Sequence, residues 1–390
     1  MTPRTWLAAL ALALVAAAPA GAFESRGSTA LVVDHATGLT LYAKNADTPL
    51  PPASMSKLMT LYMLFDALRD GRVTPETEFI VSDHAQEMGG SRMFLEAGKK
   101  VQVKDLILGI IVQSGNDACV VVAENLYGSE SAFAKAMTER AHELGMNGTT
   151  LKNASGWPEP GHVMSAEDLV TIARRIMTDF PEEYAHFSQT EFTYNGITQQ
   201  NRNPLLTAGL GADGLKTGHT SEAGYGLVGS AVRDGQRIVF VISGLGSLQD
   251  RSAESAEIVN WAFGAFETLK LYDKGAEVAQ AEVWLGAAPT VPLVPGETIQ
   301  MLVPRGAAAQ AKARVVYDGP VPAPVAAGQQ IGRLEVTLPD APPASFPLLA
   351  GADVAEGGLG VRIQAAGRTA IDRALALLPG RGEAPAAAEE

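Results

Sequence analysis

The chain has 390 residues, of which 46% are hydrophobic and 19% charged, so it can bury large cores and divide into two or three domains. Its formal net charge of −13 argues against a nucleic-acid partner and against non-specific adhesion to acidic membranes, because phosphates attract basic proteins. The one cysteine, Cys119, cannot form an internal disulfide, and its apolar neighbours predict a small buried side chain.

The first 22 residues have the features of a secretory signal peptide. A short basic start at residues 1–4 precedes an apolar run over residues 6–18, and residues 20–22 have the small-x-small form of a signal-peptidase site. We therefore expect export to the periplasm, with the mature chain starting near Phe23. The alternative is an uncleaved anchor, although the run is short for a transmembrane span.

A candidate nucleophile follows a predicted hairpin over residues 29–34 and 39–43. A helix is predicted to begin near Ala53, because the prolines before it are tolerated only ahead of a helix or in its first turn. Ser54 and Lys57 then lie on one face of that turn. A lysine whose pKa is lowered by an apolar pocket can act as the base for a serine nucleophile. The alternative is a capping serine with the lysine in solvent.

A polar turn is predicted between two apolar helices, over residues 105–112 and 118–126. Polar side chains held against a buried region are costly unless they have partners or a role. Ser114 can relay a proton, and Asn116 can both donate to and accept from a peptide-like substrate. The alternative is a simple corner in which Ser114 and Asp117 cap the helix ends.

Two further helices are predicted, over residues 130–144 and from Ser165 through Ile176. Ser165 and Asp168 resemble a capping box, with Asp at the position where Glu or Gln is more usual. In the loop before them, His162 is expected to make local hydrogen bonds.

The third candidate segment is Lys216-Thr217-Gly218, which precedes a buried strand predicted over residues 237–244. It suits an edge strand on which the lysine and the hydroxyl project into a cleft. The glycine would allow a substrate backbone to pair with the strand.

Together the three segments carry a family resemblance. Ser54-x-x-Lys57, Ser114-Gly115-Asn116 and Lys216-Thr217-Gly218 match, in this order, the three-part signature of penicillin-binding proteins and class A β-lactamases. From about residue 25 to 271 the chain resembles the low-molecular-mass penicillin-binding proteins that act as serine-type D-alanyl-D-alanine carboxypeptidases. The middle motif reads Ser-Gly-Asn rather than the Ser-Asp-Asn of class A enzymes. Four more stretches resemble this family: residues 90–95, 111–119, 201–203 and 216–220.

This resemblance implies an α+β fold, in which an antiparallel sheet flanked by helices, with a helical subdomain, is followed by a small all-β domain. It implies that Ser54 is the nucleophile, Lys57 the general base and Ser114 a proton relay, with Asn116 and Lys216 completing the catalytic group. It also implies an oxyanion hole formed by the backbone N–H groups of Ser54 and His219.

The implied substrate is a peptidoglycan stem peptide, with β-lactam antibiotics as inhibitors. The substrate-binding residues that follow are Lys216, Thr217, Gly218, Thr220 and Arg251. Because arginine can hold a carboxylate through two parallel hydrogen bonds, Arg251 would select a free C-terminus. The alternative for Arg251 is a surface ion pair with Asp250 or Glu254.

Beyond residue 271 short β-like runs appear between prolines and glycines, which predicts a small β sandwich. The runs are residues 281–285, 299–303, 314–317 and 331–336. The expected domains are a signal peptide at 1–22, the penicillin-binding domain at 23–272, the β domain at 273–366, and a short helix with an acidic tail at 367–390. This tail is poor in aromatic and basic residues, so we weigh weak peripheral membrane attachment against a soluble periplasmic protein.

Three other functions stay open at this point. A β-lactamase would share the fold but hydrolyse its acyl-enzyme quickly, and an endopeptidase of the same superfamily would cut cross-links between stems. A protein of a different class would be a catalytically idle module that binds peptidoglycan. No metal or other cofactor is expected, because the six histidines lack the close spacings of zinc ligands.

Overall fold

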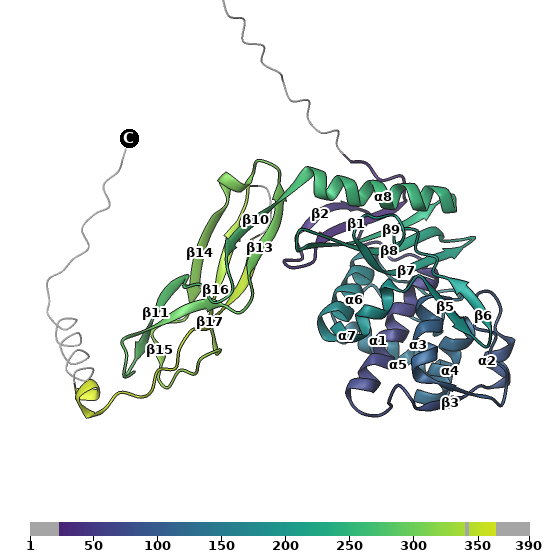
Figure 1. The fold of residues 1–390 in the computed structure, drawn as a ribbon, viewed down its shortest axis with the longest axis horizontal. Helices are drawn as coiled ribbons and strands as arrows, with labels where there is room; N and C mark the ends of the chain where they lie inside the picture. Colours follow the sequence, from purple (N-terminus) through teal and green to yellow (C-terminus); the bar gives the residue numbers. More distant parts are fainter. Residues whose placement is uncertain (1–22, 340–342, 364–390) are drawn as a thin grey trace, which may run out of the picture.

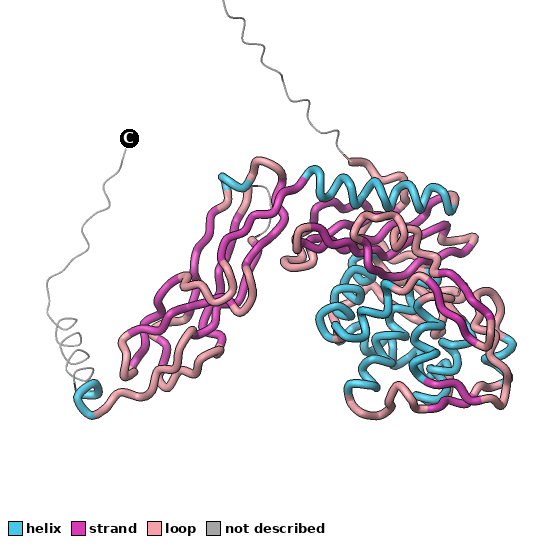
Figure 2. The backbone as a smooth tube through the Cα atoms, in the orientation of Figure 1, coloured by secondary structure: helices cyan, strands magenta, loops and turns pink. Residues whose placement is uncertain are grey.

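The computed structural model describes residues 23–339 and 343–363. The helices gather in the N-terminal part, whereas the C-terminal part consists almost entirely of strands (Figure 2). The expected signal peptide and the expected tail helix lie outside the described residues. Within the described residues, no helix combines the length and the apolar character needed to cross a membrane.

A five-stranded antiparallel sheet forms the centre of the first domain, in the order β2-β1-β9-β8-β7 (Figure 1). Its strands are β1 (Thr29–Asp34), β2 (Thr40–Lys44), β7 (Ala212–Thr220), β8 (Gly224–Arg233) and β9 (Gln236–Leu245). The predicted hairpin is β1 and β2, and the predicted buried strand is β9. Strand β7, which carries Lys216, lies at an edge of the sheet as expected.

The two faces of this sheet belong to separate hydrophobic cores. Along β9, Ile238, Phe240 and Ile242 pack towards helix α8 (Leu248–Ala265), whereas Val239 and Val241 belong to the core shared with the other helices. This alternation is the two-residue period of a strand with both faces buried. Helix α8 covers one face of the sheet, and a layer of helices covers the other (Figure 1).

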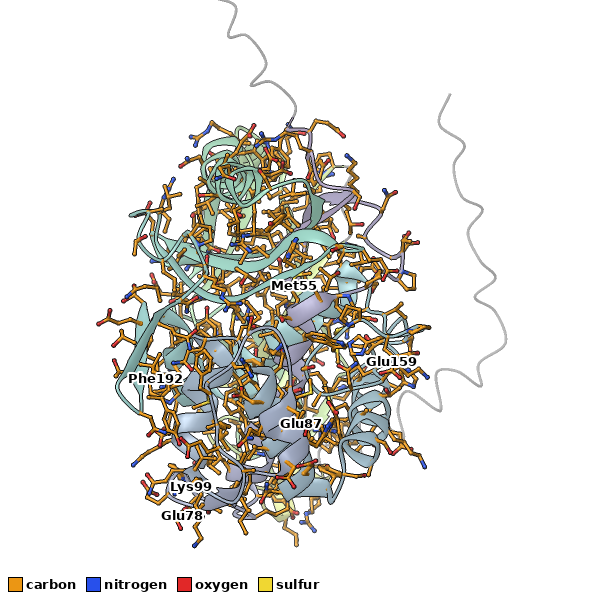
Figure 3. The ribbon with its side chains drawn as sticks, turned by 90° about the vertical axis from the view of Figure 1, so that its right-hand side faces the viewer. Met55, Glu78, Glu87, Lys99, Glu159 and Phe192 are labelled. Carbon is orange, nitrogen blue, oxygen red and sulfur yellow. The ribbon has the colours of Figure 1, made fainter. Side chains whose placement is uncertain are left out.

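The helical layer is built around α1, whose side chains are buried from Lys57 to Ala67. The elements of this layer are η1 (Ala53–Ser56), α1 (Lys57–Arg69), α2 (Asp83–Glu87), α3 (Val103–Ile111), α4 (Asn116–Tyr127), α5 (Glu130–Glu143), α6 (Ala166–Asp179), α7 (Pro181–Tyr184) and η2 (Ala185–Ser188). Two small hairpins accompany them, β3 (Glu78–Ile80) with β4 (Lys100–Gln102), and β5 (Glu191–Tyr194) with β6 (Ile197–Gln200). Met55 lies where the sheet meets this layer (Figure 3).

The expected capping box of α6 is only half formed. The hydroxyl of Ser165 accepts from the backbone N–H of Asp168 at 3.0 Å, as predicted. The carboxylate of Asp168, however, accepts from the hydroxyl of Thr149 at 2.8 Å. The shorter Asp side chain therefore joins the preceding loop to the helix rather than closing the box.

The second domain is all β, as expected, with a six-stranded sheet in the order β14-β16-β17-β12-β11-β15 and a ribbon of β10 with β13. Its elements are β10 (Phe266–Tyr272), β11 (Ala279–Trp284), β12 (Thr290–Pro295), β13 (Ile299–Pro304), η3 (Ala308–Gln310), β14 (Lys312–Tyr317), β15 (Val321–Pro322), β16 (Gln330–Thr337) and β17 (Ala344–Ala350). Strands β12, β15 and β17 contain proline, which hid them from a sequence reading that takes proline as a boundary.

The boundary between the domains lies earlier than expected. Helix α8 ends at Ala265, and β10 starts at the next residue and pairs with β13. The second domain therefore begins at Phe266 rather than at residue 273. Side chains cross the boundary in both directions, because Leu302 of β13 is buried in the core beneath α8 and Leu39 is buried in the core of the second domain.

Candidate active site

Ser54 and Lys57 lie where a short 3-10 turn, η1, leads into α1. The predicted helix start near Ala53 is therefore this 3-10 turn, and Ala53 itself has a left-handed backbone with φ of 49°. The ammonium group of Lys57 donates to the hydroxyl oxygen of Ser54 at 2.8 Å. Lys57 has no exposed surface, so the alternative of a lysine in solvent does not describe this structure.

Two further acceptors fix the amine of Lys57. It donates to the side-chain oxygen of Asn116 at 2.7 Å and to the backbone carbonyl of Ser155. Burial, with a smaller contribution from the charge of Arg202, lowers the pKa of Lys57 to about 8. A substantial fraction of Lys57 is therefore neutral near pH 8 and can accept a proton from Ser54.

The turn between α3 and α4 brings Ser114 beside Lys216. Ser114 has a left-handed φ of 58°, and its hydroxyl accepts from the ammonium of Lys216 at 2.9 Å. Lys216 also donates to the carbonyl of Thr217 at 3.2 Å. Burial, together with the charges of Lys57 and Arg202, lowers the pKa of Lys216 well below its usual range. The hydroxyl and the amine thus form a second serine–lysine pair.

Asn116 and Asp117 organise the loop that follows α2. The side-chain nitrogen of Asn116 donates to the carbonyl of Gly89 at 2.8 Å, so this amide holds both the loop and Lys57. The carboxylate of Asp117 accepts from the N–H groups of Met93 at 3.0 Å and Leu95 at 3.2 Å. Asp117, in the first turn of α4, therefore stabilises this loop through two hydrogen bonds.

A cavity of about 770 Å³, called the first hollow below, opens beside Ser54 and Ser114. Its further lining includes Arg202, Thr217, His219 and Arg251. Arg251 is 5% exposed and its Nε has no partner among the described residues, whereas Glu254 pairs with Arg26 at 3.0 Å. The alternative of a surface ion pair for Arg251 therefore does not describe the structure.

Comparisons with known proteins identify the family of the chain. The family model described as D-alanyl-D-alanine carboxypeptidase matches residues 15–246, and that of the penicillin-binding protein 5 C-terminal domain matches residues 266–356. The D-alanyl-D-alanine carboxypeptidases DacD and DacC of Escherichia coli are 35% and 36% identical to the chain, over 87% and 85% of its length and 90% and 85% of theirs. The chain belongs to the D-alanyl-D-alanine carboxypeptidase family.

Solved structures of penicillin-binding proteins share the fold. Penicillin-binding protein 5 from Haemophilus influenzae is 35% identical, with a TM-score of 0.74, and the match covers 85% of this chain and 98% of that one. Penicillin-binding protein D2 from Listeria monocytogenes, solved in an ampicillin-bound form, is 29% identical with a TM-score of 0.55, over 60% of this chain and 97% of that one. The expected fold and family are thus confirmed.

Not all predicted substrate-binding residues of this carboxypeptidase family member share one cavity. Thr217, Gly218 and Arg251 line the first hollow. Thr220 instead lines two other cavities near Ser54, and its hydroxyl accepts from the N–H of Ala223 at 3.0 Å. His219 faces the first hollow, with its ring stacked 3.9 Å from that of Tyr225. The oxyanion-hole role of its backbone N–H stays a prediction.

Gly218 has a steric role that the sequence reading did not foresee. A Cβ atom there would lie 3.0 Å from the carbonyl oxygen of Pro52 and 3.2 Å from the Cβ of Ala53. Such contacts are tighter than ordinary van der Waals spacing, so a side chain would push β7 away from the turn that carries Ser54. The glycine thus lets the edge strand approach the nucleophile.

Sequence reasoning left Arg202 out of the candidate site. Its guanidinium donates to the hydroxyl of Ser91, and its carbonyl accepts from Arg251 at 3.1 Å, so both arginines line one wall of the first hollow. The only signal was the short stretch of residues 201–203, whose likeness to the family assigns no role by itself.

The loop after α5 was also missed. The carbonyl of Ser155 holds Lys57, and Gly156 has a left-handed φ of 75°. A Cβ on Gly156 would lie 1.9 Å from the carbonyl oxygen of Ala53, so only glycine allows the two backbones to approach. No local pattern in the sequence announces this contact, because it joins segments that are about 100 residues apart.

Proposed function

We propose that this member of the family is a serine-type D-alanyl-D-alanine carboxypeptidase that removes the terminal D-alanine from peptidoglycan stem peptides through an acyl-enzyme on Ser54. The observation that carries the proposal is the fully buried amine of Lys57, 2.8 Å from the Ser54 hydroxyl at the edge of the first hollow. A serine becomes a useful nucleophile only when such a base is in place.

Acylation starts with a proton transfer. Neutral Lys57 takes the hydroxyl proton of Ser54 while the oxygen attacks the carbonyl carbon of the penultimate D-alanine. The negative charge that develops on the carbonyl oxygen is held by the backbone N–H groups of Ser54 and His219. Losing one donor of this kind typically costs about 10²–10³ in rate.

The tetrahedral intermediate then releases the terminal D-alanine. The carbon–nitrogen bond breaks, and the leaving nitrogen receives a proton from Lys216 through the hydroxyl of Ser114, which are 2.9 Å apart. A water molecule next attacks the ester carbonyl and gives a proton to Lys216 through the hydroxyl of Ser114, which restores the charge of Lys216. The ester bond to Ser54 breaks, Lys57 returns its proton to the Ser54 oxygen, and the shortened peptide leaves as a carboxylic acid that loses its proton to solvent. Asn116 positions Lys57 in both halves of the reaction.

The carboxylate of the terminal D-alanine would bind in the first hollow. Arg202 and Arg251 place two guanidinium groups in its lining, and Thr217 adds a hydroxyl. Burial lowers the pKa of each arginine, but arginine keeps its charge in proteins. A free C-terminal carboxylate therefore gains strong charge-assisted hydrogen bonds, which favours cleavage at the chain end.

The adduct with a β-lactam provides the test. Benzylpenicillin contains a strained amide whose leaving group stays tethered after ring opening, so it should leave a long-lived adduct on Ser54. We expect intact mass spectrometry to show this adduct and peptide mapping to place it on Ser54. The Ser54→Ala variant should form no adduct and release no D-alanine, and either activity in that variant would overturn the assignment.

The lifetime of the adduct separates the other functions. Rapid loss with turnover of penicillin would indicate a β-lactamase, and no adduct would indicate an idle binding module. Release of cross-linked stems without release of D-alanine would indicate an endopeptidase.

We further propose that the chain acts outside the cytoplasm, where its substrate is found. The support is the signal-type segment at residues 1–22. Weak attachment to the membrane through residues 367–390 is a separate expectation, which co-flotation of the mature protein with anionic vesicles tests.

A further inference from the structure

The loop over residues 153–157 lies along the first turns of α1. Two consecutive carbonyls of this loop meet the helix: that of Ala154 accepts from the hydroxyl of Thr60 at 2.6 Å, and that of Ser155 accepts from the amine of Lys57. Thr60 and Lys57 are three residues apart and therefore lie on one face of α1. The position of the Ser155 carbonyl thus depends on what holds this loop.

The side chain of Asn153 closes the loop. Asn153 is 6% exposed, and its side-chain oxygen accepts from the backbone N–H groups of three successive residues. They are Ser155 at 3.2 Å, Gly156 at 2.9 Å and Trp157 at 3.1 Å. Its side-chain nitrogen donates to the carbonyl of Trp157 at 2.9 Å. Asparagine suits such a turn because its short amide reaches the backbone of the next residues.

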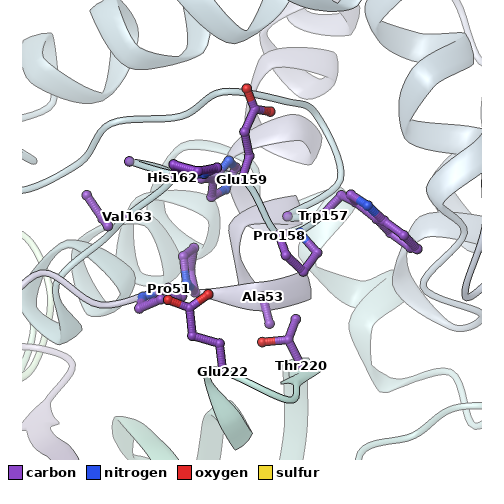
Figure 4. Close-up of a pocket in the computed structure, with 13 residues that line it drawn as sticks. Pro51, Ala53, Trp157, Pro158, Glu159, His162, Val163, Thr220 and Glu222 are labelled. Carbon is purple, nitrogen blue, oxygen red and sulfur yellow. The ribbon is translucent and has the colours of Figure 1, made fainter.

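Two of these N–H groups have no substitute partner. Among the described residues, those of Ser155 and Gly156 donate only to Asn153, and both residues are buried. A buried N–H without an acceptor is unfavourable, so the loop cannot keep its path without the oxygen of Asn153. Its path is also confined by the nucleophile turn, because Trp157 and Pro158 continue past Ala53 (Figure 4).

The Ser155 carbonyl bears on the chemistry of Lys57. A neutral amine has two N–H groups and one lone pair. The side-chain oxygen of Asn116 and the carbonyl of Ser155 can only accept, so they take the two N–H groups. The lone pair then faces the remaining neighbour, the hydroxyl of Ser54 at 2.8 Å. An amine that lost the Ser155 carbonyl could turn and donate to Ser54 instead.

A change at residue 153 leaves the charged and titratable neighbours of Lys57 in place. Those that interact electrostatically with it are Asp117, Cys119, His162, Arg202 and Lys216. The ring of His162 makes the expected local hydrogen bond, in which its Nδ1 accepts from the N–H of Lys152 at 3.1 Å. Burial lowers the pKa of His162 to about 4, so this ring stays neutral above pH 6.

We propose that Asn153 is a positioning residue for the general base. Its amide holds the loop so that the Ser155 carbonyl takes one N–H of neutral Lys57 and the lone pair of the amine points at the Ser54 hydroxyl. The inference rests on the proposed function, because it assumes that Lys57 is the base for Ser54. Asn153 does not line the two described cavities to which Ser54 contributes, so its effect passes through Lys57.

Two substitutions of Asn153 test this role. Asn153→Ala removes the acceptor oxygen, and Asn153→Asp keeps it. Both are made in a Glu159→Gln parent, because Glu159 lies 3.2 Å from the Asn153 nitrogen and would repel the new carboxylate. Acylation by benzylpenicillin is followed by intact mass at several concentrations, from about pH 6 to pH 9.5. This yields the limiting rate of acylation and the dissociation constant of the initial complex. The fraction that finally carries the adduct counts the folded protein.

We expect Asn153→Ala to lower the limiting rate by about tenfold to 10²-fold at every pH, which is the range for a displaced catalytic group. The dissociation constant should change little. Asn153→Asp should recover most of the limiting rate at high pH. Its carboxylate stabilises the charged form of Lys57 and raises the pKa of that amine, so the pH of half-maximal rate should rise by about one unit.

Asn125 provides a control for the general loss of hydrogen bonds. On α4, its side chain accepts from the N–H of Ile80 at 3.1 Å and donates to the carbonyls of Ile80 at 2.9 Å and Val121 at 2.8 Å. These contacts join α4 to β3, away from the loop over residues 153–157. Asn125→Ala should lower the melting temperature and keep the limiting rate and its pH profile.

A limiting rate in Asn153→Ala equal to that of the parent would overturn the inference and leave the proposed function standing. The inference would also fall if Asn153→Asp were as slow as Asn153→Ala, if its pH profile did not move, or if only the dissociation constant changed. An equal loss of rate in Asn125→Ala would count against it in the same way. Absence of any adduct on the wild-type protein would overturn the proposed function and this inference with it.

Discussion

The burial of Lys57 sets the pH dependence expected for acylation of Ser54. Because Ser54 can pass its proton only to a neutral amine, the rate of acylation should rise with pH and reach half of its maximum near pH 8, the pKa of Lys57. We expect this profile for the second-order rate of acylation by benzylpenicillin, followed by intact mass from about pH 6 to pH 9.5.

Two observations would separate this base from other titrating groups. The variant Lys57→Met has no amine to titrate and should lose the adduct. His162, with a pKa of about 4, is neutral over the whole range and should add no step. A rate that stays constant through pH 8 would contradict the assignment of Lys57 as the base.

Gly156 tests the close approach beside the nucleophile. Gly156→Ala should slow acylation and lower the free energy of unfolding by more than the ~1–2 kcal/mol of a left-handed alanine, because its Cβ would collide with the carbonyl of Ala53. Gly161 is a matched control, since its φ of 80° is similar and the nearest atom to its Cβ is 3.5 Å away. Equal losses in Gly161→Ala and Gly156→Ala, measured by thermal unfolding, would contradict this account.

At the residue scale, the sequence predicted the groups whose chemistry is local. Ser54 and Lys57 are one helical turn apart, so their pairing follows from spacing alone. Arg202, Ser155 and Gly156 act through contacts with distant segments, and the chain pattern does not encode which loop meets which. The resemblance to the penicillin-binding proteins placed Ser114 and Lys216 in one site, which no periodicity of the sequence predicts.

At the scale of elements, the loop over residues 88–95 depends on the first turn of α4. Asp117→Asn replaces one acceptor oxygen by a donor and should leave the N–H of Met93 or of Leu95 unpaired, at a cost of about 1–3 kcal/mol. Because this loop also holds Asn116 through Gly89, we expect acylation by benzylpenicillin to slow as well.

A surface aspartate provides the comparison for this loop. Asp83→Asn makes the same change in the first turn of α2, where the side chain is exposed, and it should leave unfolding and acylation nearly unchanged. Hydrogen exchange in residues 88–95 reports the loop directly. Protection in Asp117→Asn equal to that of the wild-type protein would show that the loop does not need the carboxylate.

Elements with strong periodicity were predicted, and those without it were not. The buried strand β9 and helices such as α5 follow from pattern alone. Strands β12 and β17 contain proline at positions that the sheet tolerates, and α8 went unpredicted although it covers a whole face of the first sheet. Tertiary pairing, rather than local preference, decides these segments.

At the scale of the whole molecule, Leu302 couples the two domains. It belongs to β13 of the second domain but is buried in the core beneath α8. Leu302→Ala should therefore destabilise the first domain by about 2–5 kcal/mol, although the substitution lies outside it. Calorimetry before and after reaction with benzylpenicillin identifies the transition of the first domain, because Ser54, where we expect the adduct, lies in that domain.

Leu348 is the matched control, since it is fully buried within the second domain. Leu348→Ala should lower only the transition that benzylpenicillin does not affect. A first-domain transition that is the same in Leu302→Ala and in the wild-type protein would show that the contact carries no coupling.

The direct connection from α8 to β10 ties the second domain closely to the first. No linker separates Ala265 from Phe266, and the backbone N–H of Arg305 and its side chain donate to the carbonyls of Ala265 and Gly264 at 2.9 and 3.0 Å. These hydrogen bonds join the end of α8 to the residue that follows β13, where α8 runs directly into β10 (Figure 1). If the far end of the second domain were tethered, the length of this domain would set how far the cavity beside Ser54 lies from the point of attachment.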